Sequence, residues 1–349
     1  MNLFDYKRPS SIADAVAAGA EPGAAYLAGG TNLLDLMKVG ARKPDVLVDI
    51  SRLPGLGEIE TLQDGSVRIG ALVRNSDLAR NTAFAKAYPA VAEALLSGAS
   101  AQLRNAATVG GNLMQQTRCL YFYDQQSRCN RRQPGAGCDA IGGETSKHAV
   151  LGWTNQCIAT HPSDFCVALA ALEAGVELEG PDGPRSVSVE EFYALPTEDA
   201  PGGADIRPGE LVTAVTLPAG AARFAGHARY IKLRDRTSYA FAIVSAAAMA
   251  DISDGVVQEI RIAIGGVAAR PWRARSAEAA LKGKAPSPEL IGSAAEAALA
   301  DASPSGDNAY KIELAKRLVH RAIEQALAGT PQTIPALPGS VFSAQAAGR

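Results

Sequence analysis

The chain has 349 residues, with 34 Lys and Arg against 36 Asp and Glu, four His and five Cys. This length suits two or three domains, and 47% apolar residues with 20% charged ones provide enough material for buried cores. The net charge of -2 argues against nucleic acid as a partner, because such proteins normally carry a basic face. No uninterrupted apolar window is long enough for a membrane span, and the N-terminus lacks the pattern of a secretory signal, so we expect neither.

Residues 1–54 are predicted to form a small α/β unit. SSIADAVAAGA and TNLLDLMKVG are typical of helices, whereas AAYLAGG and VLVDI are typical of buried strands. SVRIGALVRNSDLARN then predicts a strand that runs into a helix with Ser76 as its N-cap. AVAEALLSGASAQLRNAATVGGN predicts a helix followed by a glycine turn.

Two similar glycine turns, LAGGTN and ATVGGN, are each predicted where a strand ends. Adjacent glycine N–H groups, unobstructed by a Cβ, can surround a pyrophosphate, with Thr and Asn side chains completing the contacts. Neither turn is a Rossmann or Walker sequence. A plain tight turn is the alternative for each, although the repeated chemistry favours a nucleotide cofactor.

The segment 115–158 has no sustained helical or strand period and contains most of the cysteines, so we expect an insertion organised by a ligand. Cys119, Cys129, Cys138 and Cys157 are separated by nine, eight and eighteen residues, which differs from the CxxC pairs usual in structural zinc sites. Widely spaced loops can each give one sulfur to an iron–sulfur cluster, with nearby arginines offsetting its charge: Arg118, Arg128, Arg131 and Arg132. A cluster is therefore favoured, with zinc and no ligand as alternatives. Cys166 is expected to be a small core residue in the helix FCVALAAL.

Beyond the insertion, an α+β pattern continues to about residue 220. Residues 221–329 predict a smaller domain of antiparallel strands, joined by an Asp-Gly turn, followed by helices. Residues 330–349 form a Pro-rich tail. The predicted domains are thus 1–220, with subdomains 1–54 and 55–220, then 221–329 and the tail.

Two polar segments have open interpretations. Either Ser163 or Asp164 is expected to cap the helix that follows HPSD, or Asp164 accepts hydrogen bonds from a ribose or adenine. Lys232, Arg234 and Arg236 are expected on one face of a strand, either as a solvated edge or with a cation near a flavin ring.

The sequence resembles the FAD-binding subunit of the molybdenum hydroxylases, the xanthine dehydrogenase and carbon monoxide dehydrogenase family. The resemblance rests on AGGTNLLDLMK, RIGALVRNSDL, QLRNAATVGGNL, PSD, IKLRDRTSYAFAIVS and IGGVAARPWRA, which cover roughly residues 3–325. The insertion most closely resembles that of the periplasmic aldehyde oxidoreductases. The implied fold is an α+β flavin domain of two subdomains with a cysteine-rich cluster insertion, followed by a smaller sheet-and-helix domain.

The resemblance implies site residues for two cofactors. Those for FAD are Leu27, Ala28, Gly29, Gly30, Thr31, Asn32, Leu33, Thr108, Gly111, Asn112, Asp164 and Lys232. Those for an extra [4Fe-4S] cluster are Cys119, Cys129, Cys138 and Cys157, with Cys166 unused. No catalytic residue is implied in this chain.

The implied function is electron transfer in a molybdenum-dependent aldehyde oxidoreductase of heterotrimer type. The molybdenum cofactor and two [2Fe-2S] clusters are expected on partner chains, and the FAD would pass electrons to an external acceptor. A periplasmic location by co-export with a partner is implied, with a cytoplasmic location as the alternative. The alternative function is a non-catalytic nucleotide-binding or zinc-stabilised assembly protein.

Overall fold

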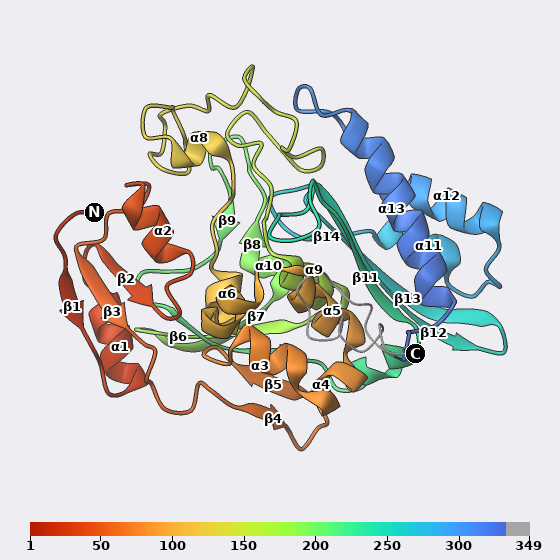
Figure 1. The fold of residues 1–349 in the computed structure, drawn as a ribbon, viewed down its shortest axis with the longest axis horizontal. Helices are drawn as coiled ribbons and strands as arrows, with labels where there is room; N and C mark the ends of the chain where they lie inside the picture. Colours follow the sequence, from red (N-terminus) through yellow and green to blue (C-terminus); the bar gives the residue numbers. More distant parts are fainter. Residues whose placement is uncertain (333–349) are drawn as a thin grey trace.

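A computed structural model describes residues 1–332, so most of the predicted Pro-rich tail, residues 333–349, lies outside the described residues. The N-terminal unit is a three-stranded parallel sheet in the order β1-β3-β2 with two helices, as its alternating pattern predicts. It lies on one side of the molecule in Figure 1. Its elements are β1 (Asp5–Lys7), α1 (Ile12–Gly19), β2 (Ala24–Leu27), α2 (Leu33–Lys38) and β3 (Val46–Asp49).

The second subdomain is built on a five-stranded antiparallel sheet in the order β4-β5-β10-β6-β7. Its strands are β4 (Ile59–Thr61), β5 (Val67–Gly70), β6 (Gly175–Gly180), β7 (Gly183–Ser188) and β10 (Leu211–Leu217). Short helices follow β5: α3 (Asn75–Arg80), α4 (Thr82–Ala87), α5 (Pro89–Ser97), α6 (Ala101–Ala106) and α7 (Val109–Leu113). A small hairpin of β8 (Tyr193–Ala194) and β9 (Gly203–Ala204) follows α10 (Val189–Phe192).

Two local predictions in this region are wrong. The N-cap position of α3 is Arg74, without a side-chain cap bond, and Ser76 lies buried inside the helix, where its hydroxyl donates to Asp77. The single helix expected before the second glycine pair is divided into α5 and α6, because the chain turns at Gly98 and Ala99 and the latter has φ +52°. Ser100 then caps α6 by accepting from the Leu103 amide.

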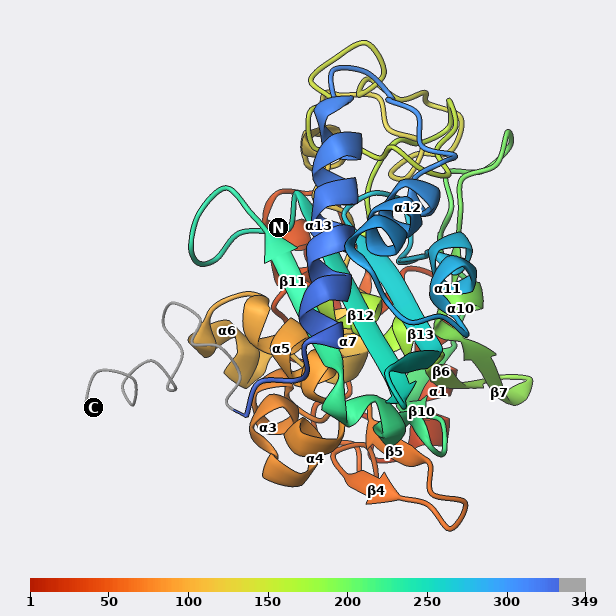
Figure 2. The same ribbon diagram turned by 90° about the vertical axis from the view of Figure 1, so that its right-hand side faces the viewer.

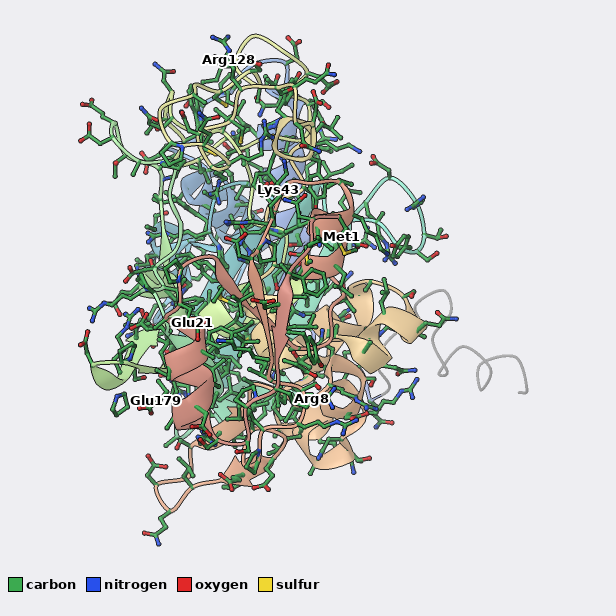
Figure 3. The ribbon with its side chains drawn as sticks, turned by 90° about the vertical axis from the view of Figure 1, so that its left-hand side faces the viewer. Met1, Arg8, Glu21, Lys43, Arg128 and Glu179 are labelled. Carbon is green, nitrogen blue, oxygen red and sulfur yellow. The ribbon has the colours of Figure 1, made fainter. Side chains whose placement is uncertain are left out.

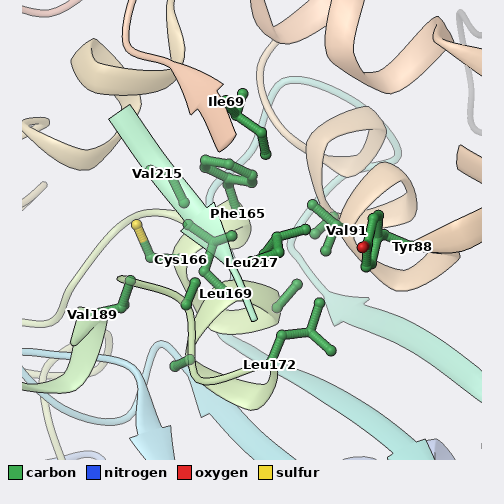
Figure 4. Close-up of a cluster of buried hydrophobic side chains, with 14 of the residues drawn as sticks. Ile69, Tyr88, Val91, Phe165, Cys166, Leu169, Leu172, Val189, Val215 and Leu217 are labelled. Atoms are coloured by element: carbon green, nitrogen blue, oxygen red, sulfur yellow. The ribbon is translucent and has the colours of Figure 1, made fainter. Parts of the chain in front are cut away.

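Helix α9 (Asp164–Ala171) is the centre of the main core (Figure 4). All eight of its residues are buried, which is the pattern of a helix covered on every side. Phe165 and Leu169 pack with Ile69 and Leu217 of the five-stranded sheet, and Tyr230 and Met249 of the C-terminal domain belong to the same cluster. The core is therefore continuous across the predicted domain boundary near residue 220.

The C-terminal region is a four-stranded antiparallel sheet, in the order β11-β12-β13-β14, with three helices. Figure 2 shows α13 lying along β11 and β12. The Asp254-Gly255 turn joins β12 to β13 with positive φ at both residues, as predicted. The elements are η1 (Ala221–Gly226), β11 (Ala228–Leu233), β12 (Val244–Ser253), β13 (Val256–Gly265), β14 (Trp272–Arg273), α11 (Arg275–Leu281), α12 (Pro288–Ala298) and α13 (Tyr310–Leu327).

The insertion contains a single short helix, α8 (Leu120–Tyr123), and otherwise turns and isolated bridges, in agreement with its lack of periodicity. It lies at one end of the molecule, with Arg128 near its outer tip (Figure 3). Buried Lys311 at the start of α13 donates to the backbone carbonyls of Lys147, His148 and Gly266, and Asn308 donates to those of His148 and Ala149. The C-terminal domain therefore holds the insertion in position. Within the described part of the chain, every helix is too short or too polar to span a membrane.

Candidate functional site

The two glycine segments lie against each other. The first follows β2, which ends at Leu27, and leads into α2, which begins at Leu33. A Cβ on Gly29 would lie only 2.0 Å from the carbonyl oxygen of Ala106, at the end of α6. Gly30 has φ +70°, a conformation that favours glycine. The backbone of the second glycine segment thus requires a residue without a side chain at position 29.

The second glycine pair differs from the prediction, since it lies in α7 and not at the end of a strand. Thr108 precedes this helix, and its Oγ1 accepts a hydrogen bond from the Gly111 amide at 3.2 Å. The chain turns into a helix because this threonine satisfies one of its free amides. Thr108 is buried and Gly111 is exposed. Their shared hydrogen bond fixes the shape of the segment.

Asn32 connects the first glycine segment to the residues that follow α7. Its Oδ1 accepts from the Gln116 amide at 2.9 Å, whereas its buried Nδ2 has no partner among the described residues. A buried N–H group without an acceptor is costly, so this one is suited to an acceptor from outside the chain. A pyrophosphate oxygen is such an acceptor. Ala28, Thr31 and Leu33 are partly buried around it.

Asn112 connects α7 to the start of α9. Ser163 donates its hydroxyl to Asn112 Oδ1 at 2.7 Å and accepts from the Cys166 amide at 3.1 Å. Ser163 is therefore the helix cap, which leaves the neighbouring Asp164 carboxylate available for side-chain contacts.

Asp164 binds two side chains from β11. Lys232 Nζ lies 2.8 Å from Asp164 Oδ2, and the Tyr230 hydroxyl donates to Oδ1 at 2.5 Å. The side chains of Lys232 and Asp164 are only 4% and 8% exposed, so the expected solvated edge is wrong for Lys232. Burial, reinforced by the Asp164 charge, raises the pKa of Tyr230 well above its usual value.

The three cations expected on one strand face also differ from the prediction. Lys232 Nζ and Arg234 Nη1 both donate to the carbonyl of Ser97, each at 3.2 Å. Strand β11 ends at Leu233, and Arg236 lies in the following loop, where it donates to the carbonyl of Tyr239. Strand β11 is therefore shorter than the alternation of Lys232, Arg234 and Arg236 predicts.

A cavity, which we name the His161 cavity, adjoins this ion pair. His161 accepts from the Ser163 amide through Nδ1 at 3.3 Å, so its hydrogen is on Nε2, which is buried without a partner among the described residues. Burial, with a smaller effect of Arg131, lowers the pKa of His161 to about 3, so the ring is neutral. Sequence reasoning did not select His161, because it precedes a helix cap without any motif of its own. The cavity is lined by Arg118, Thr160, His161, Pro162, Ser163, Asp164, Phe241, Ala242, Ser245, Gly265 and Gly266.

The four insertion cysteines line a second cavity, which we name the cysteine cavity. All are free thiols, and Cys129 and Cys138 face each other in an antiparallel bridge. Burial and the other thiols raise the pKa of Cys119 to about 12 and also raise that of Cys138. The wall is completed by Thr117, Tyr121, Phe122, Arg128, Asn130, Arg131, Ala140, Gln156, Ile158 and Ala159. Cys166 lies elsewhere, fully buried on α9 and in contact with Tyr193.

One short segment of chain, residues 157–164, contributes consecutive residues to both cavities. Cys157, Ile158 and Ala159 line the cysteine cavity, and residues 160–164 line the His161 cavity. Among residues 1–332, no three Cys, His, Asp or Glu side chains lie close enough together to hold one metal ion. The four insertion cysteines nevertheless all line the one cysteine cavity.

Sequence comparisons identify both parts of the chain. The family model of the FAD binding domain in molybdopterin dehydrogenase matches residues 2–220, and that of the CO dehydrogenase flavoprotein C-terminal domain matches residues 229–326. The aldehyde oxidoreductase FAD-binding subunit of Escherichia coli is 45% identical over 330 residues, 94% of this chain and 99% of that one. The carbon monoxide dehydrogenase medium chain of Hydrogenophaga pseudoflava is 31% identical, over 93% of this chain and 97% of that one.

Solved structures share the fold. Carbon monoxide dehydrogenase from Hydrogenophaga pseudoflava has a TM-score of 0.73 and 30% identity, covering 94% of this chain and 98% of that one. Quinoline 2-oxidoreductase from Pseudomonas putida has a TM-score of 0.71 and 26% identity, covering 94% of this chain and 99% of that one. The resemblance seen in the sequence is confirmed over nearly the whole chain, and the protein belongs to the FAD-binding medium subunits of the molybdenum hydroxylase family.

Proposed function

We propose that this chain is the flavin subunit of a molybdenum-dependent aldehyde oxidoreductase and that it also carries a [4Fe-4S] cluster. The observation that carries the substrate class is the 45% identity, over 94% of this chain, to an aldehyde oxidoreductase subunit. The carbon monoxide dehydrogenase relative has 31% identity over a similar length. The difference favours aldehydes as the substrate class of the assembled enzyme.

The flavin site consists of the joined glycine segments and the residues around Asp164. We propose that Asn32 Nδ2 donates to the pyrophosphate, since it is buried and has no other partner in the described chain. The remaining contacts are assigned to the segment from Leu27 to Leu33 and to Thr108, Gly111, Asn112, Asp164 and Lys232. His161 is added because its free Nε2–H belongs to the wall of the adjoining cavity. Bound FAD would accept electrons from one redox centre and deliver them to another.

The cysteine cavity supports the cluster assignment. Four cysteines that line one cavity, with an arginine that donates to one of their sulfurs, form a donor set suited to iron–sulfur ligation. The wide spacing of these cysteines along the chain also differs from the CxxC pairs of structural zinc sites, which favours a cluster over zinc. Burial opposes ionisation of the Cys119 and Cys138 thiols, so binding of a positively charged metal centre would stabilise their thiolates.

We assign no catalytic residue to this chain. Aldehyde oxidation would take place on a partner subunit with the molybdenum cofactor, with a second partner carrying [2Fe-2S] clusters and an external acceptor receiving the electrons. We further propose a periplasmic location by co-export with a partner. Fractionation of cells that express the complex tests the location, and recovery only from the cytoplasm would contradict it.

The central experiment is cofactor analysis of the complex purified after co-expression with its partner chains. We expect one FAD per copy of this chain and about four irons beyond those of the [2Fe-2S] clusters. Cys138→Ser should remove those four irons, and Cys166→Ser should not, because Cys166 lies in the core away from the cavity. Iron content unchanged in Cys138→Ser would exclude the cluster assignment. A colourless, zinc-containing chain would support an assembly protein instead.

A further inference from the structure

We propose that Arg131 and His148 are positioning residues that donate N–H hydrogen bonds to Cys157 and Cys119 and so raise the reduction potential of the iron–sulfur cluster. This inference rests on the proposed cluster site. It gives Arg131, one of four arginines near the cysteines in sequence, a specific contact, and it assigns a role to His148, which the cysteine pattern does not select.

Arg131 contacts a cysteine sulfur directly. Its Nε donates to Cys157 Sγ at 3.3 Å, and its side chain is part of the cysteine cavity wall. After burial, the charge of Arg131 is the second cause of the lowered pKa values of His161 and Arg42. A guanidinium is always protonated, so this donor carries a full positive charge at the sulfur.

His148 contacts the sulfur of a second cysteine. Its Nε2 lies 3.2 Å from Cys119 Sγ. The backbone of His148 is held on both sides, since its amide donates to Thr145 at 2.9 Å and its carbonyl accepts from Lys311 at 2.8 Å. A metal-bound cysteine is a thiolate with no hydrogen to give. The imidazole must then donate its own Nε2–H to the sulfur.

The other arginines of the insertion do not contact sulfur. Arg128 lies on the surface and pairs with Asp139 at 2.7 Å. Arg132 donates to the backbone carbonyls of Tyr121, Phe122 and Ser127. Arg118 stacks on Phe241 in the wall of the His161 cavity. Of the four arginines expected to offset the cluster charge, Arg131 is the one that donates to a cysteine sulfur in the described chain.

Hydrogen bonds to the sulfurs of an iron–sulfur cluster stabilise the additional negative charge of the reduced state. A charged donor stabilises it more than a neutral one, because an ion strengthens the hydrogen bond. Loss of either donor should therefore make reduction harder and the midpoint potential more negative. The effect should be larger for Arg131 than for His148.

The test is a redox titration of the [4Fe-4S] signal by electron paramagnetic resonance in the whole complex. We expect Arg131→Met and His148→Phe to keep their iron and to have midpoint potentials below that of the wild type, with the larger shift for Arg131→Met. Lys147→Met is the matched control, because it removes an exposed charge, paired with Asp235, from the same insertion, and Lys147 does not line the cysteine cavity. It should titrate as the wild type does.

Wild-type midpoint potentials in both iron-loaded variants would overturn the inference, and so would an equal shift in Lys147→Met. If either variant loses iron, Arg131→Lys and His148→Gln, which keep an N–H group, are titrated in its place. A smaller shift in the same direction is then expected, and no shift contradicts the inference. Absence of the extra iron from the wild type would instead contradict the cluster assignment, together with this inference.

Discussion

The Lys232 ammonium and the Asp164 carboxylate form a buried ion pair, 2.8 Å apart, between β11 of the C-terminal domain and the first turn of α9. The pair joins the two domains at the edge of the His161 cavity, which Asp164 lines. Its burial makes the loss of one partner costly, because the other charge then remains in a poorly solvated place.

Lys232→Met should therefore destabilise the protein by about 3–5 kcal/mol and reduce its FAD content. The double variant Lys232→Met/Asp164→Asn should recover part of this loss, since no charge is then left buried alone. Urea unfolding of both variants measures the change in stability, and their flavin-to-protein absorbance ratio measures the FAD content. Arg317→Met, which removes an exposed pair with Glu313, is the control and should cost less than about 1 kcal/mol. Equal losses in Lys232→Met and Arg317→Met would contradict the prediction.

Gly29→Ala should separate the two glycine segments. The new Cβ would lie 2.0 Å from the Ala106 carbonyl oxygen, which is part of the backbone and cannot move aside cheaply. We expect a loss of about 1–3 kcal/mol in stability and of most bound FAD, measured by the flavin-to-protein absorbance ratio after gel filtration. Gly57→Ala is the matched control, because no atom lies within 4 Å of its Cβ position. A Gly29→Ala protein with full flavin would show that this contact is not needed.

Lys311→Met should loosen the insertion. Burial lowers the pKa of Lys311 to about 7, and the three carbonyl oxygens of Lys147, His148 and Gly266 compensate the buried ammonium. Methionine would leave these acceptors unpaired, at about 1–3 kcal/mol for a buried group. We expect faster proteolysis within residues 115–158 and lower iron retention. Arg317→Met, on the exposed face of the same helix, should leave both unchanged.

Protonation of Asp49, at the end of β3, should lower the free energy of unfolding of the protein in acid. Burial by itself raises the pKa of Asp49, but hydrogen bonds from Ser51, Tyr6 and Arg8 outweigh it and lower the pKa to about 2 from 3.8. The folded state therefore binds this proton more weakly than the unfolded state. The stabilisation, about 2 kcal/mol, is present above pH 4 and is lost as the pH falls from about 4 to 2.

Asp49→Asn tests this expectation by urea unfolding at several pH values. The variant should be less stable than the wild type at pH 7, and the difference should narrow as the pH approaches 2. A difference that stays constant with pH would assign the effect to packing and not to the carboxylate charge.

The sequence by itself determined those features that depend on neighbouring residues. The Asp254-Gly255 turn, the Ser11 cap of α1 and the free thiols of an irregular insertion all follow from local chemistry. The two glycine pairs are likewise local signals, for which a cofactor role stays a prediction, and one of them begins a helix. These signals, placed in order along the chain, were sufficient for the family and the fold class.

Only the tertiary structure decided which polar groups meet. Asp164 and Lys232 are 68 residues apart, and Lys311 reaches a carbonyl 163 residues away. No pattern along the chain distinguishes Arg131, which contacts a sulfur, from Arg128, which points to solvent on the same insertion. Such contacts depend on how separate elements pack, and that packing is set by the shared core around α9 and not by the residues beside each charge.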